Sequence, residues 1–426
     1  KGIPVTVGHT AENVGGAGLV VLSSAVKSGN PELIAAKAAG LTVWSRAEML
    51  ARLMQDYRTI SVTGTHGKTT TTSMIAWIFE AAELDPTVIT GGIIKDWGTN
   101  ARIGKGEWFI VEADESDETF VKLPTDIGVV TNIDPEHLDY YGSVEAMHDA
   151  YRRFFSGIQP GGAIVAGIDH PVVRQFAESA KLSEGSRLLR YGVAEDADVR
   201  IERIRMNGAG IHIDVDLSGA VKRGAHRIED LTLAVPGRYN ALNAMAAIAV
   251  AKEAGIDEKV IRKALASFHG VKRRFTCTGV WNGVSIYDDY AHHPAEIAAV
   301  LEAARGAASG RVIAIVQPHR YSRLKNLFEE FSTCFGNSDT VIVTPVYSAG
   351  EEPNGVDRDK LIEGLRRHGQ RQVLPVDGED ALPGLIATLA KPGDLVIGMG
   401  AGTITEWTHA LPGRLDSLQS RLDAAE

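Results

Sequence analysis

The strongest chemical signal in this sequence is the segment Gly64-Thr65-His66-Gly67-Lys68-Thr69-Thr70. It follows an apolar run at 58–62 and precedes a helical pattern. Glycines let backbone N–H groups point at phosphate oxygens, and the start of a helix adds partial positive charge. Lys68 can neutralise the β- and γ-phosphates, and the Thr69 hydroxyl can bind Mg²⁺. We therefore interpret residues 64–70 as a nucleotide-binding loop.

The segment departs from the pattern G-x-x-x-x-G-K-[ST] in one place. The first glycine of that pattern would fall at residue 62, where the sequence has Val62, and Gly64 follows two residues later. A glycine-rich turn beside an ordinary helix start is the structural alternative. The preceding strand, the two glycines and the threonine-rich helix start favour nucleotide binding.

Two later strand-like segments also end in polar residues. The run 108–111 ends in the acidic stretch 112–117, and the run 127–131 leads to His137. The carboxyl ends of parallel strands meet in the crevice where ligands bind, and carboxylate oxygens suit Mg²⁺. A solvated acidic loop is the alternative for 112–117, and an ordinary surface or core histidine is the alternative for His137. Convergence of three strand ends favours a metal or phosphate site.

These residues must be positioned by an alternation of strands and helices that runs through most of the chain. Such alternation predicts βαβ units and parallel sheets. Residues 199–235 instead alternate apolar and polar side chains, which is typical of antiparallel strands with one face in water. Strands are predicted at 4–7, 18–23, 58–62, 87–89, 108–112, 127–131, 199–204, 210–217, 231–235, 284–287, 312–316, 340–343, 372–376 and 395–398, and helices at 31–39, 47–54, 71–84 and 239–254.

The fold class that follows is α/β with three domains. Residues 1–56 match part of a Rossmann-like N-terminal domain, residues 57–274 form a central P-loop-type ATPase domain, and residues 275–426 form a Rossmann-like C-terminal domain. A length of 426 residues is consistent with about three domains of the usual size.

Charge and composition disfavour some classes of function. The net charge is −10, which disfavours general nucleic-acid binding while leaving room for a small anionic ligand. No run of about 18 apolar residues is present, so we expect no membrane insertion. Cys277 and Cys334 are the only cysteines, which favours a reducing cytoplasm over a disulfide scaffold. We expect a monomer or a weak homodimer.

Several segments together resemble the Mur ligase family, which makes bacterial cell-wall precursors. The resemblance covers nearly the whole chain and rests on these segments: Gly64–Thr70, Glu112–Asp117, Thr131–Asp139, Pro236–Ala244, Arg273–Phe275, Asp288–Pro294 and Gln317–Arg323. It implies ATP-driven amide formation through an acyl phosphate, with Mg²⁺. The last two segments look most like the members that join L-alanine to the carboxylate of UDP-N-acetylmuramate. Members that add a tripeptide to the same acceptor are the alternative, and a regulatory P-loop ATPase or kinase is a different class.

The resemblance also implies roles for single residues. The domains would bind the UDP substrate (1–56), ATP (57–274) and the amino acid (275–426). Lys68 would hold the β/γ-phosphates, Thr69 and Glu112 would hold one Mg²⁺ and His137 a second, and Arg274 would reach the γ-phosphate. Asn240 and Asn243, three apart on one helix face, would lie at the adenine, and Asp289 at the ribose. Substrate contacts would come from Ser116, Tyr290, His292, His293, Arg320 and Arg323, with His292 also placed at the reacting acyl end.

Two departures from the family pattern stand out. The glycine-rich UDP-binding loop expected at the start has no counterpart in residues 1–56, so we expect a further N-terminal piece. Sister ligases carry a carbamoylated lysine after the histidine motif, but no lysine occurs between His137 and Gly161. Arg152 and Arg153 are candidates to supply the missing charge.

Overall fold

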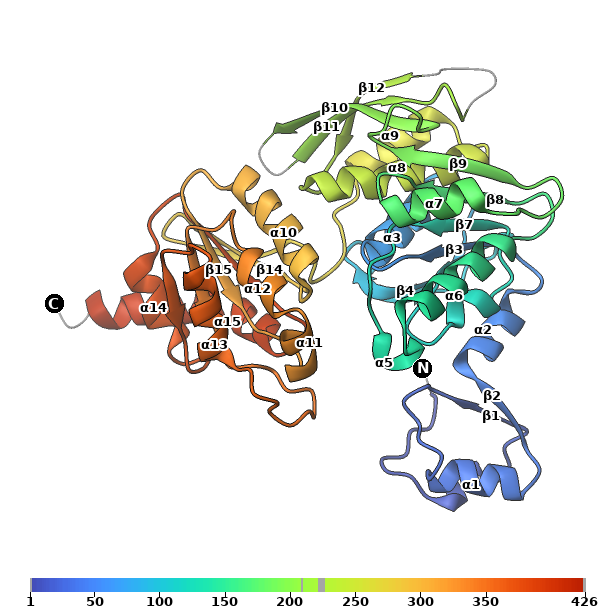
Figure 1. The fold of residues 1–426 in the computed structure, drawn as a ribbon, viewed down its shortest axis with the longest axis horizontal. Helices are drawn as coiled ribbons and strands as arrows, with labels where there is room; N and C mark the ends of the chain where they lie inside the picture. The colour runs from blue at the N-terminus through green and yellow to red at the C-terminus, as the bar shows by residue number, and fades with distance from the viewer. Residues whose placement is uncertain (1, 208–209, 221–226, 424–426) are drawn as a thin grey trace.

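A computed structural model describes residues 2–207, 210–220 and 227–423 (Figure 1). Within these ranges the chain forms three sheets, of two, ten and six strands, each flanked by helices. The predicted α/β class is therefore confirmed. Lys1 and residues 424–426, the outer ends of the first and third predicted domains, lie outside the described residues.

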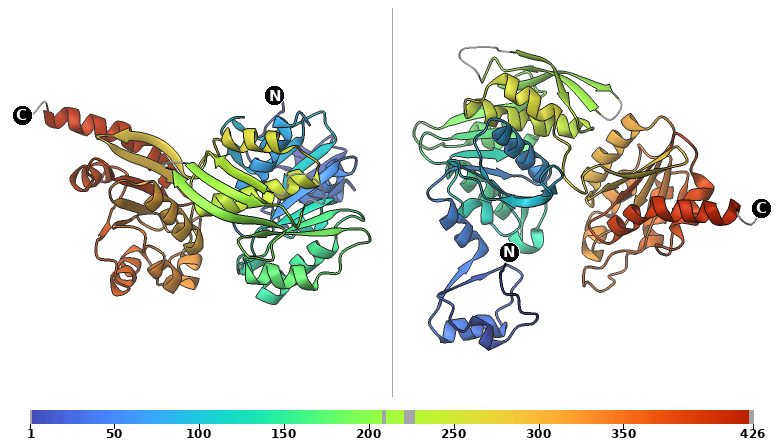
Figure 2. Two further views of the ribbon diagram at one scale, coloured as in Figure 1. Left: turned by 90° about the horizontal axis from the view of Figure 1, so that it is seen from above. Right: turned by 180° about the vertical axis from the view of Figure 1, so that it is seen from behind.

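The N-terminal unit is small and lies apart from the C-terminal part of the chain in every view (Figures 1 and 2). Its two strands pair in parallel, and the helices α1 and α2 follow them. Their bounds are β1 Leu19–Leu22, α1 Pro31–Ala38, β2 Thr42–Ser45 and α2 Arg46–Met54, after a 3-10 turn at Ala11–Val14. The strand predicted at 4–7 is wrong, because this segment pairs with no described strand and Val7 is 98% exposed.

The central sheet is parallel in its middle and antiparallel at both edges. The predicted antiparallel meander is confirmed, since β10, β11 and β12 pair in antiparallel fashion at one edge. In sheet order the strands are β12 Arg227–Leu233, β11 Gly210–Asp216, β10 Val199–Asn207, β9 Arg187–Gly192, β8 Ala163–Gly167, β7 Ile127–Val130, β3 Arg58–Thr63, β6 Trp108–Glu112, β4 Thr87–Ile94 and β5 Thr99–Arg102.

Helices cover both faces of this sheet. One core packs α3 (Lys68–Ala81), α8 (Arg238–Glu253) and α9 (Glu258–Ala266) against one face. The alanine-rich α8 is buried along nearly its whole length, as expected for a helix that is apolar all round. On the other face lie α4 Thr119–Lys122, α5 Leu138–Tyr141, α6 Val144–Ser156 and α7 Pro171–Ser179.

Helix α3 begins at Lys68, three residues before its predicted start at Thr71. The glycine-rich pattern at 64–70 predicted a loop as far as Thr70. Side-chain hydrogen bonds instead hold the first turn of the helix from Lys68 onward. The Thr72 hydroxyl donates to the Lys68 carbonyl at 2.8 Å, and the Thr69 hydroxyl donates to Glu112 at 3.0 Å. The earlier start places Lys68 in the first helical turn.

The C-terminal sheet is parallel except for its edge strand β13. Side chains of β15 alternate between two cores, with Val312, Ala314 and Val316 on one side and Ile313 and Ile315 on the other. In sheet order the strands are β13 Thr276–Trp281, β14 Val284–Asp289, β18 Leu395–Met399, β15 Val312–Val316, β16 Thr340–Val343 and β17 Val373–Pro375. The helices are α10 Pro294–Ala307, α11 Tyr321–Asn326, α12 Phe328–Thr333, α13 Arg358–Arg367, α14 Leu382–Leu389 and α15 Ile404–Asp423.

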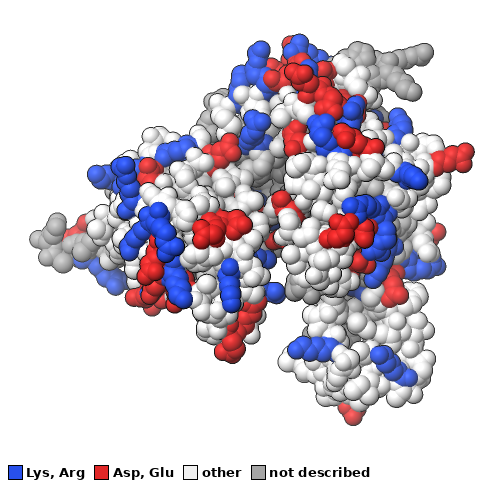
Figure 3. Space-filling model, in the orientation of Figure 1, with Lys and Arg blue, Asp and Glu red and all other residues white. Residues whose placement is uncertain are grey.

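The central and C-terminal domains meet at the carboxyl ends of their parallel strands. The chain passes between them at Arg273–Phe275, where Arg273 (φ +62°) and Phe275 (φ +45°) adopt left-handed backbone conformations. The C-terminal helix α15 begins near the connection between the domains, where Arg273 donates to the Gly400 carbonyl, and its other end lies on the side of its domain away from the central domain (Figure 2). Lys and Arg are interspersed with Asp and Glu on the face in Figure 3, with no broad basic stripe there. Among the described helices, none combines the length and apolar character that a membrane span requires.

Candidate active site

Residues 64–70, the predicted phosphate loop, connect β3 to α3. Gly64 (φ +126°) and Gly67 (φ +84°) adopt backbone conformations that side chains disfavour, and a Cβ on Gly67 would lie 2.5 Å from the Asn243 amide oxygen. The Lys68 ammonium donates to the Gly64 carbonyl at 2.6 Å and to Glu115 at 2.8 Å. Burial alone would lower the pKa of Lys68, but the Glu115 carboxylate outweighs it and the pKa is raised. The loop therefore presents a fixed positive charge at the start of a helix.

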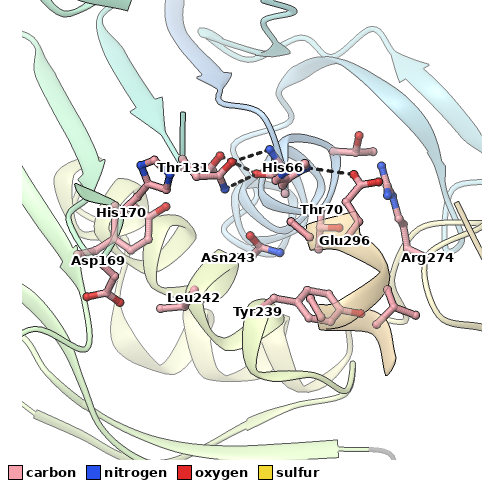
Figure 4. A pocket seen from close by; sticks show the side chains of 18 of the residues that line it. His66, Thr70, Thr131, Asp169, His170, Tyr239, Leu242, Asn243, Arg274 and Glu296 are labelled. Carbon is pink, nitrogen blue, oxygen red and sulfur yellow. Dashed lines mark hydrogen bonds and ion pairs between the residues drawn. The ribbon is translucent and has the colours of Figure 1, made fainter. Parts of the chain in front are cut away.

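A cavity of about 360 Å³ opens beside this loop (Figure 4). That volume falls within the usual range for a small-molecule site. Its walls come from both large domains: His66, Gly67, Thr69, Thr70, Thr131, Asn132, Gly167, Asp169, His170, Tyr191, Tyr239, Leu242, Asn243 and Arg274 from the central domain and its connection, and Asp289, Ala295, Glu296, Ala299 and Val300 from the C-terminal domain.

Thr69 and Glu112, the pair assigned to one Mg²⁺, lie in contact. The Thr69 hydroxyl donates to Glu112 Oε1 at 3.0 Å, while Glu112 Oε2 accepts from the Thr90 hydroxyl and the Gly91 amide. These contacts hold the carboxylate at the end of β6, beside the start of α3. A hydroxyl and a carboxylate oxygen fit the hard ligands that Mg²⁺ prefers.

His137 lies in a second group of possible metal ligands. One ligand atom each of Glu115, Glu136 and His137 fall within 4.8 Å of one another. His137 adopts a left-handed backbone conformation at the start of α5 (φ +55°), which directs its ring back toward Glu115, with Nε2 3.7 Å from Oε1. The structure thus groups His137 with Glu115 and Glu136, and Glu112 is not part of that group.

Of the residues assigned to the adenine and the ribose, only some line the cavity. Asn243 lines it, whereas Asn240 turns its amide to the Pro236 carbonyl and to Asn243. Asp289 lines it and accepts hydrogen bonds from the amides of Phe275 and Ala291, both at 2.7 Å. Burial raises the pKa of Asp289 to about 6.

The connection between the domains adds a guanidinium to the cavity wall. Arg274 lines the cavity. Its guanidinium carbon lies 5.3 Å from the centroid of the Tyr290 ring, in a cation–π contact. Burial alone would lower the pKa of Arg274, but the carboxylates of Glu296 and Asp289 outweigh it and raise that pKa. Arg274 is therefore a permanent cation beside the phosphate loop.

The residues assigned to the amino acid gather on two loops of the C-terminal domain. Tyr290, His292 and His293 follow β14, and the His292 ring lies 5.9 Å from the His319 ring. Arg323, in α11, donates to His319 Nδ1 at 3.3 Å and lies 3.8 Å from Glu136 of the central domain.

Arg320 lies at the start of α11, with its Nε 4.0 Å from Glu351 and its side chain 47% exposed. Across the domain boundary, the Arg323–Glu136 pair brings the loop 317–323 next to the second group of metal ligands.

Three predicted residues are not part of this arrangement. Ser116 lies in the loop after β6, where its amide donates to Asp114, and it does not line the cavity. Arg152 and Arg153 are wrong as substitutes for a modified lysine. They lie on α6 with side chains 42% and 53% exposed, where Arg152 pairs with Glu145 and Arg153 with Glu118.

Sequence reasoning missed Glu115 and Glu296 as site residues. Glu115 lies in the predicted acidic stretch, but spacing alone does not say which of its carboxylates turns toward Lys68. Glu296 occupies the third position of α10, where it completes a capping box with His293. A capping box is a common structural feature, so it carries no signal for a contact with another domain.

His66, also in this loop, has a carboxylate beside each of its ring nitrogens. Burial alone would lower the pKa of His66, but the carboxylates of Asp134 and Glu296, 3.4 Å and 3.2 Å from its two ring nitrogens, outweigh it and raise the pKa to about 9. His66 therefore binds its proton more tightly in the folded protein than in the unfolded chain. The stability that this binding contributes is complete below pH 6.5 and is lost as the pH rises through 9.

We expect the difference in unfolding free energy between the wild type and His66→Asn to shrink on raising the pH from 6.5 to 9.5. The change should be on the order of 3 kcal/mol, from 1.36 kcal/mol per pKa unit. Urea unfolding at a series of pH values measures it. A His66→Asn difference that stayed constant from pH 6.5 to 9.5 would contradict the assignment.

The fold and the site together define a multidomain α/β protein built around a phosphate loop. Family models match along the chain: "Mur ligase family, catalytic domain" at residues 1–58, "Mur ligase middle domain" at 62–251 and "Mur ligase, glutamate ligase domain" at 273–402. The chain belongs to the Mur ligase family, and the family prediction made from its motifs is confirmed.

Named relatives are highly similar. The UDP-N-acetylmuramate–L-alanine ligases of Nitrobacter hamburgensis and Nitrobacter winogradskyi are each 56% identical over 98% of this chain and 89% of their own length. Among solved structures, the UDP-N-acetylmuramate–alanine ligase of Thermotoga maritima superposes with a TM-score of 0.80 at 27% identity, covering 98% of this chain and 89% of that one.

Proposed function

We propose that this protein is an ATP-dependent ligase that joins L-alanine to the carboxylate of UDP-N-acetylmuramate, the first amino-acid addition in peptidoglycan precursor synthesis. The relatives at 56% identity carry that name. The single structural observation that carries the proposal is the approach of the arginine- and histidine-bearing loops of the C-terminal domain to the phosphate loop. That arrangement suits an enzyme that activates one substrate with ATP and delivers an amine to it.

The chemistry requires two steps. The acceptor carboxylate attacks the γ-phosphorus of ATP, which gives an acyl phosphate and ADP. The amine then attacks the acyl carbon, and the tetrahedral intermediate collapses with loss of phosphate. Two anions must approach each other in the first step, so the site must contribute to catalysis mainly by holding cations beside them. Lys68 and Arg274 supply such cations from this chain.

The proposed metal positions follow from the oxygen-rich contacts described above. Thr69 and Glu112 would hold one Mg²⁺, and His137, with Glu115 and Glu136 beside it, would hold a second. When bound, Mg²⁺ neutralises charge on the phosphate oxygens and on the attacking carboxylate.

The amine must lose a proton before it can attack. Burial lowers the pKa of His292, so its ring is neutral at physiological pH. Its Nδ1 donates to the Tyr290 carbonyl at 3.0 Å, which leaves the Nε2 lone pair free to accept a proton. We assign this role to His292 and assign the L-alanine carboxylate to Arg323 and Arg320, because guanidinium groups bind carboxylates bidentately.

ADP formation by the purified chain, measured with each substrate omitted in turn, tests the proposal. ADP should accumulate only when UDP-N-acetylmuramate, L-alanine and Mg²⁺ are all present. ADP formation with a muramoyl tripeptide but not with L-alanine would support the alternative of a tripeptide-adding enzyme. That alternative has weaker support: the murein peptide ligase of Psychrobacter arcticus, at 24% identity and a TM-score of 0.65, shares the fold alone. ATP hydrolysis that ignores both substrates would indicate a regulatory ATPase.

We expect Glu112→Gln to raise the Mg²⁺ concentration needed for half-maximal activity by at least about tenfold, because the amide cannot replace a charged ligand. The shape of the side chain is preserved, so the fold should be intact. A titration of the initial rate with MgCl₂ measures the effect. Glu107→Gln, at the opposite end of β6 and exposed, is the matched control. An unchanged Mg²⁺ requirement would remove Glu112 from the metal site.

The same proposal places the enzyme in the cytoplasm, where UDP-linked precursors and ATP are available. Both cysteines are free, which is consistent with a reducing compartment.

A further inference from the structure

Glu296 contacts three residues in two loops of the site through one carboxylate. Its Oε1 lies 3.2 Å from Nδ1 of His66 in the phosphate loop. Its Oε2 accepts from the backbone amides of His292 at 3.0 Å and His293 at 3.2 Å. The side chain is only 14% exposed. One largely buried carboxylate therefore ties residues 290–293 of the C-terminal domain, the amino-acid loop, to the phosphate loop of the central domain (Figure 4).

The central-domain end of this contact is fixed. The His66 amide donates to the Asn132 side chain at 2.7 Å, and the His66 carbonyl accepts from the Thr131 hydroxyl at 2.7 Å. On the far side of the ring, Nε2 lies 3.4 Å from Asp134, which also contacts His170. His66 thus offers Glu296 a rigid, charged partner.

Among the described residues, two ion pairs join the central and C-terminal domains: His66–Glu296 and Arg323–Glu136. The second is longer, at 3.8 Å, and uses a guanidinium that the proposed function assigns to the L-alanine carboxylate. When Arg323 binds that carboxylate, its attraction to Glu136 is shared with the substrate. The His66–Glu296 pair involves neither of the side chains assigned to L-alanine binding, so it can persist when the amino acid is bound.

We propose that the His66–Glu296 pair sets the position of the amino-acid loop over the phosphate loop, so that Glu296 acts as a positioning residue for the attack of the amine. The inference rests on the proposed function and extends it. A displacement of about 1 Å at a reacting centre can cost on the order of a hundredfold in rate, so a contact of this kind has a measurable effect. Its loss should be felt in the use of L-alanine rather than in ATP binding.

Two substitutions of His66 separate the two sides of its ring. The Asn amide nitrogen takes the place of Nδ1, so His66→Asn can still donate to Glu296. The Gln amide nitrogen takes the place of Nε2, so His66→Gln can reach Asp134 but loses Glu296. We expect His66→Gln and Glu296→Ala each to raise the KM for L-alanine by about tenfold or more, with a smaller change in the KM for ATP.

Three comparisons make this result specific. His66→Asn should raise the KM for L-alanine clearly less than His66→Gln. The double variant His66→Gln/Glu296→Ala should be no worse than Glu296→Ala, because Glu296→Ala already removes the His66–Glu296 contact that His66→Gln breaks. Glu302→Ala, an exposed glutamate of the same helix, should match the wild type. Equal effects of His66→Asn and His66→Gln, or additive effects in the double variant, would overturn the proposal.

Hydrogen exchange tests the pair without any substrate. The amides of His292 and His293 should exchange faster in His66→Gln than in His66→Asn, since only the former releases Glu296. Equal exchange in the two variants overturns the positioning role even if L-alanine is a substrate. If the wild type forms no ADP with L-alanine but the exchange difference is present, the proposed function fails while the interdomain contact stands.

Discussion

Lys68→Ala should lower the rate of ADP formation by about 10²–10³-fold, corresponding to roughly 3–4 kcal/mol of lost transition-state stabilisation, by analogy with the removal of one fixed donor. The Lys68 ammonium is held by two loop carbonyls and by Glu115, so it is in place before the nucleotide arrives. No other lysine lies in the loop to replace it. A coupled assay at saturating substrates gives the rate.

A second effect must be separated from this one. Glu115 is 3% exposed, and removing Lys68 leaves its charge buried without its cation. Breaking a buried pair in this way typically costs about 3–5 kcal/mol of stability. Lys68→Ala/Glu115→Gln removes the stranded charge, so it should regain much of the urea resistance and none of the activity. Recovery of activity in the double variant would mean that Lys68 supports the fold and not the phosphate.

The conformation of residues 64–70 was predictable because the pattern that specifies it is local. A strand, two glycines, a lysine and a threonine must be consecutive to form a phosphate loop, and residues 64–70 satisfy that requirement in the structure. Glu112 was likewise predictable from its place at the end of an apolar strand. The sequence alone does not indicate which of the neighbouring acidic residues contacts Lys68. In the structure Glu115 makes this contact and Asp114 does not, because of the way the loop after β6 turns.

Contacts between domains could not be predicted from the sequence for a related reason. His66 and Glu296 are separated by 230 positions, and each has an adequate local explanation, one as a loop residue and one as a helix cap. Nothing in either local pattern indicates that the two side chains meet. The same holds for Arg323 and Glu136, whose contact depends on the relative placement of two sheets.

Failures of the fold prediction have two physical origins. The apolar alternation at 4–7 predicts a strand, but a strand also needs a partner, and none of the described strands pairs with it. The loop predicted at 64–70 extends three residues too far, because side-chain hydrogen bonds hold the first turn of α3 from Lys68 onward. Elements between 144 and 192, including β8 and β9, were not predicted individually.

Arg323→Ala should raise the KM for L-alanine by about 10–100-fold, the range expected for losing a hydrogen bond to a charged group. Arg323 is 19% exposed and is oriented by His319, whose Nδ1 accepts from it at 3.3 Å. Burial lowers the pKa of His319 to about 4, so that ring stays neutral and can accept the hydrogen bond across the physiological pH range. A neutral acceptor positions the guanidinium without competing for its charge.

Steady-state kinetics with L-alanine as the varied substrate measure this effect, with kcat nearly constant if the contact is equally strong in the ground and transition states. Arg323→Lys should lie between the wild type and Arg323→Ala, because it keeps the charge but not the bidentate geometry. Arg320→Ala should have a smaller effect, since Arg320 is more exposed and is only loosely held by Glu351. If Arg323→Ala left the KM for L-alanine unchanged, the amino-acid carboxylate would have to bind elsewhere, and the histidines at 292 and 293 would be the next groups to test.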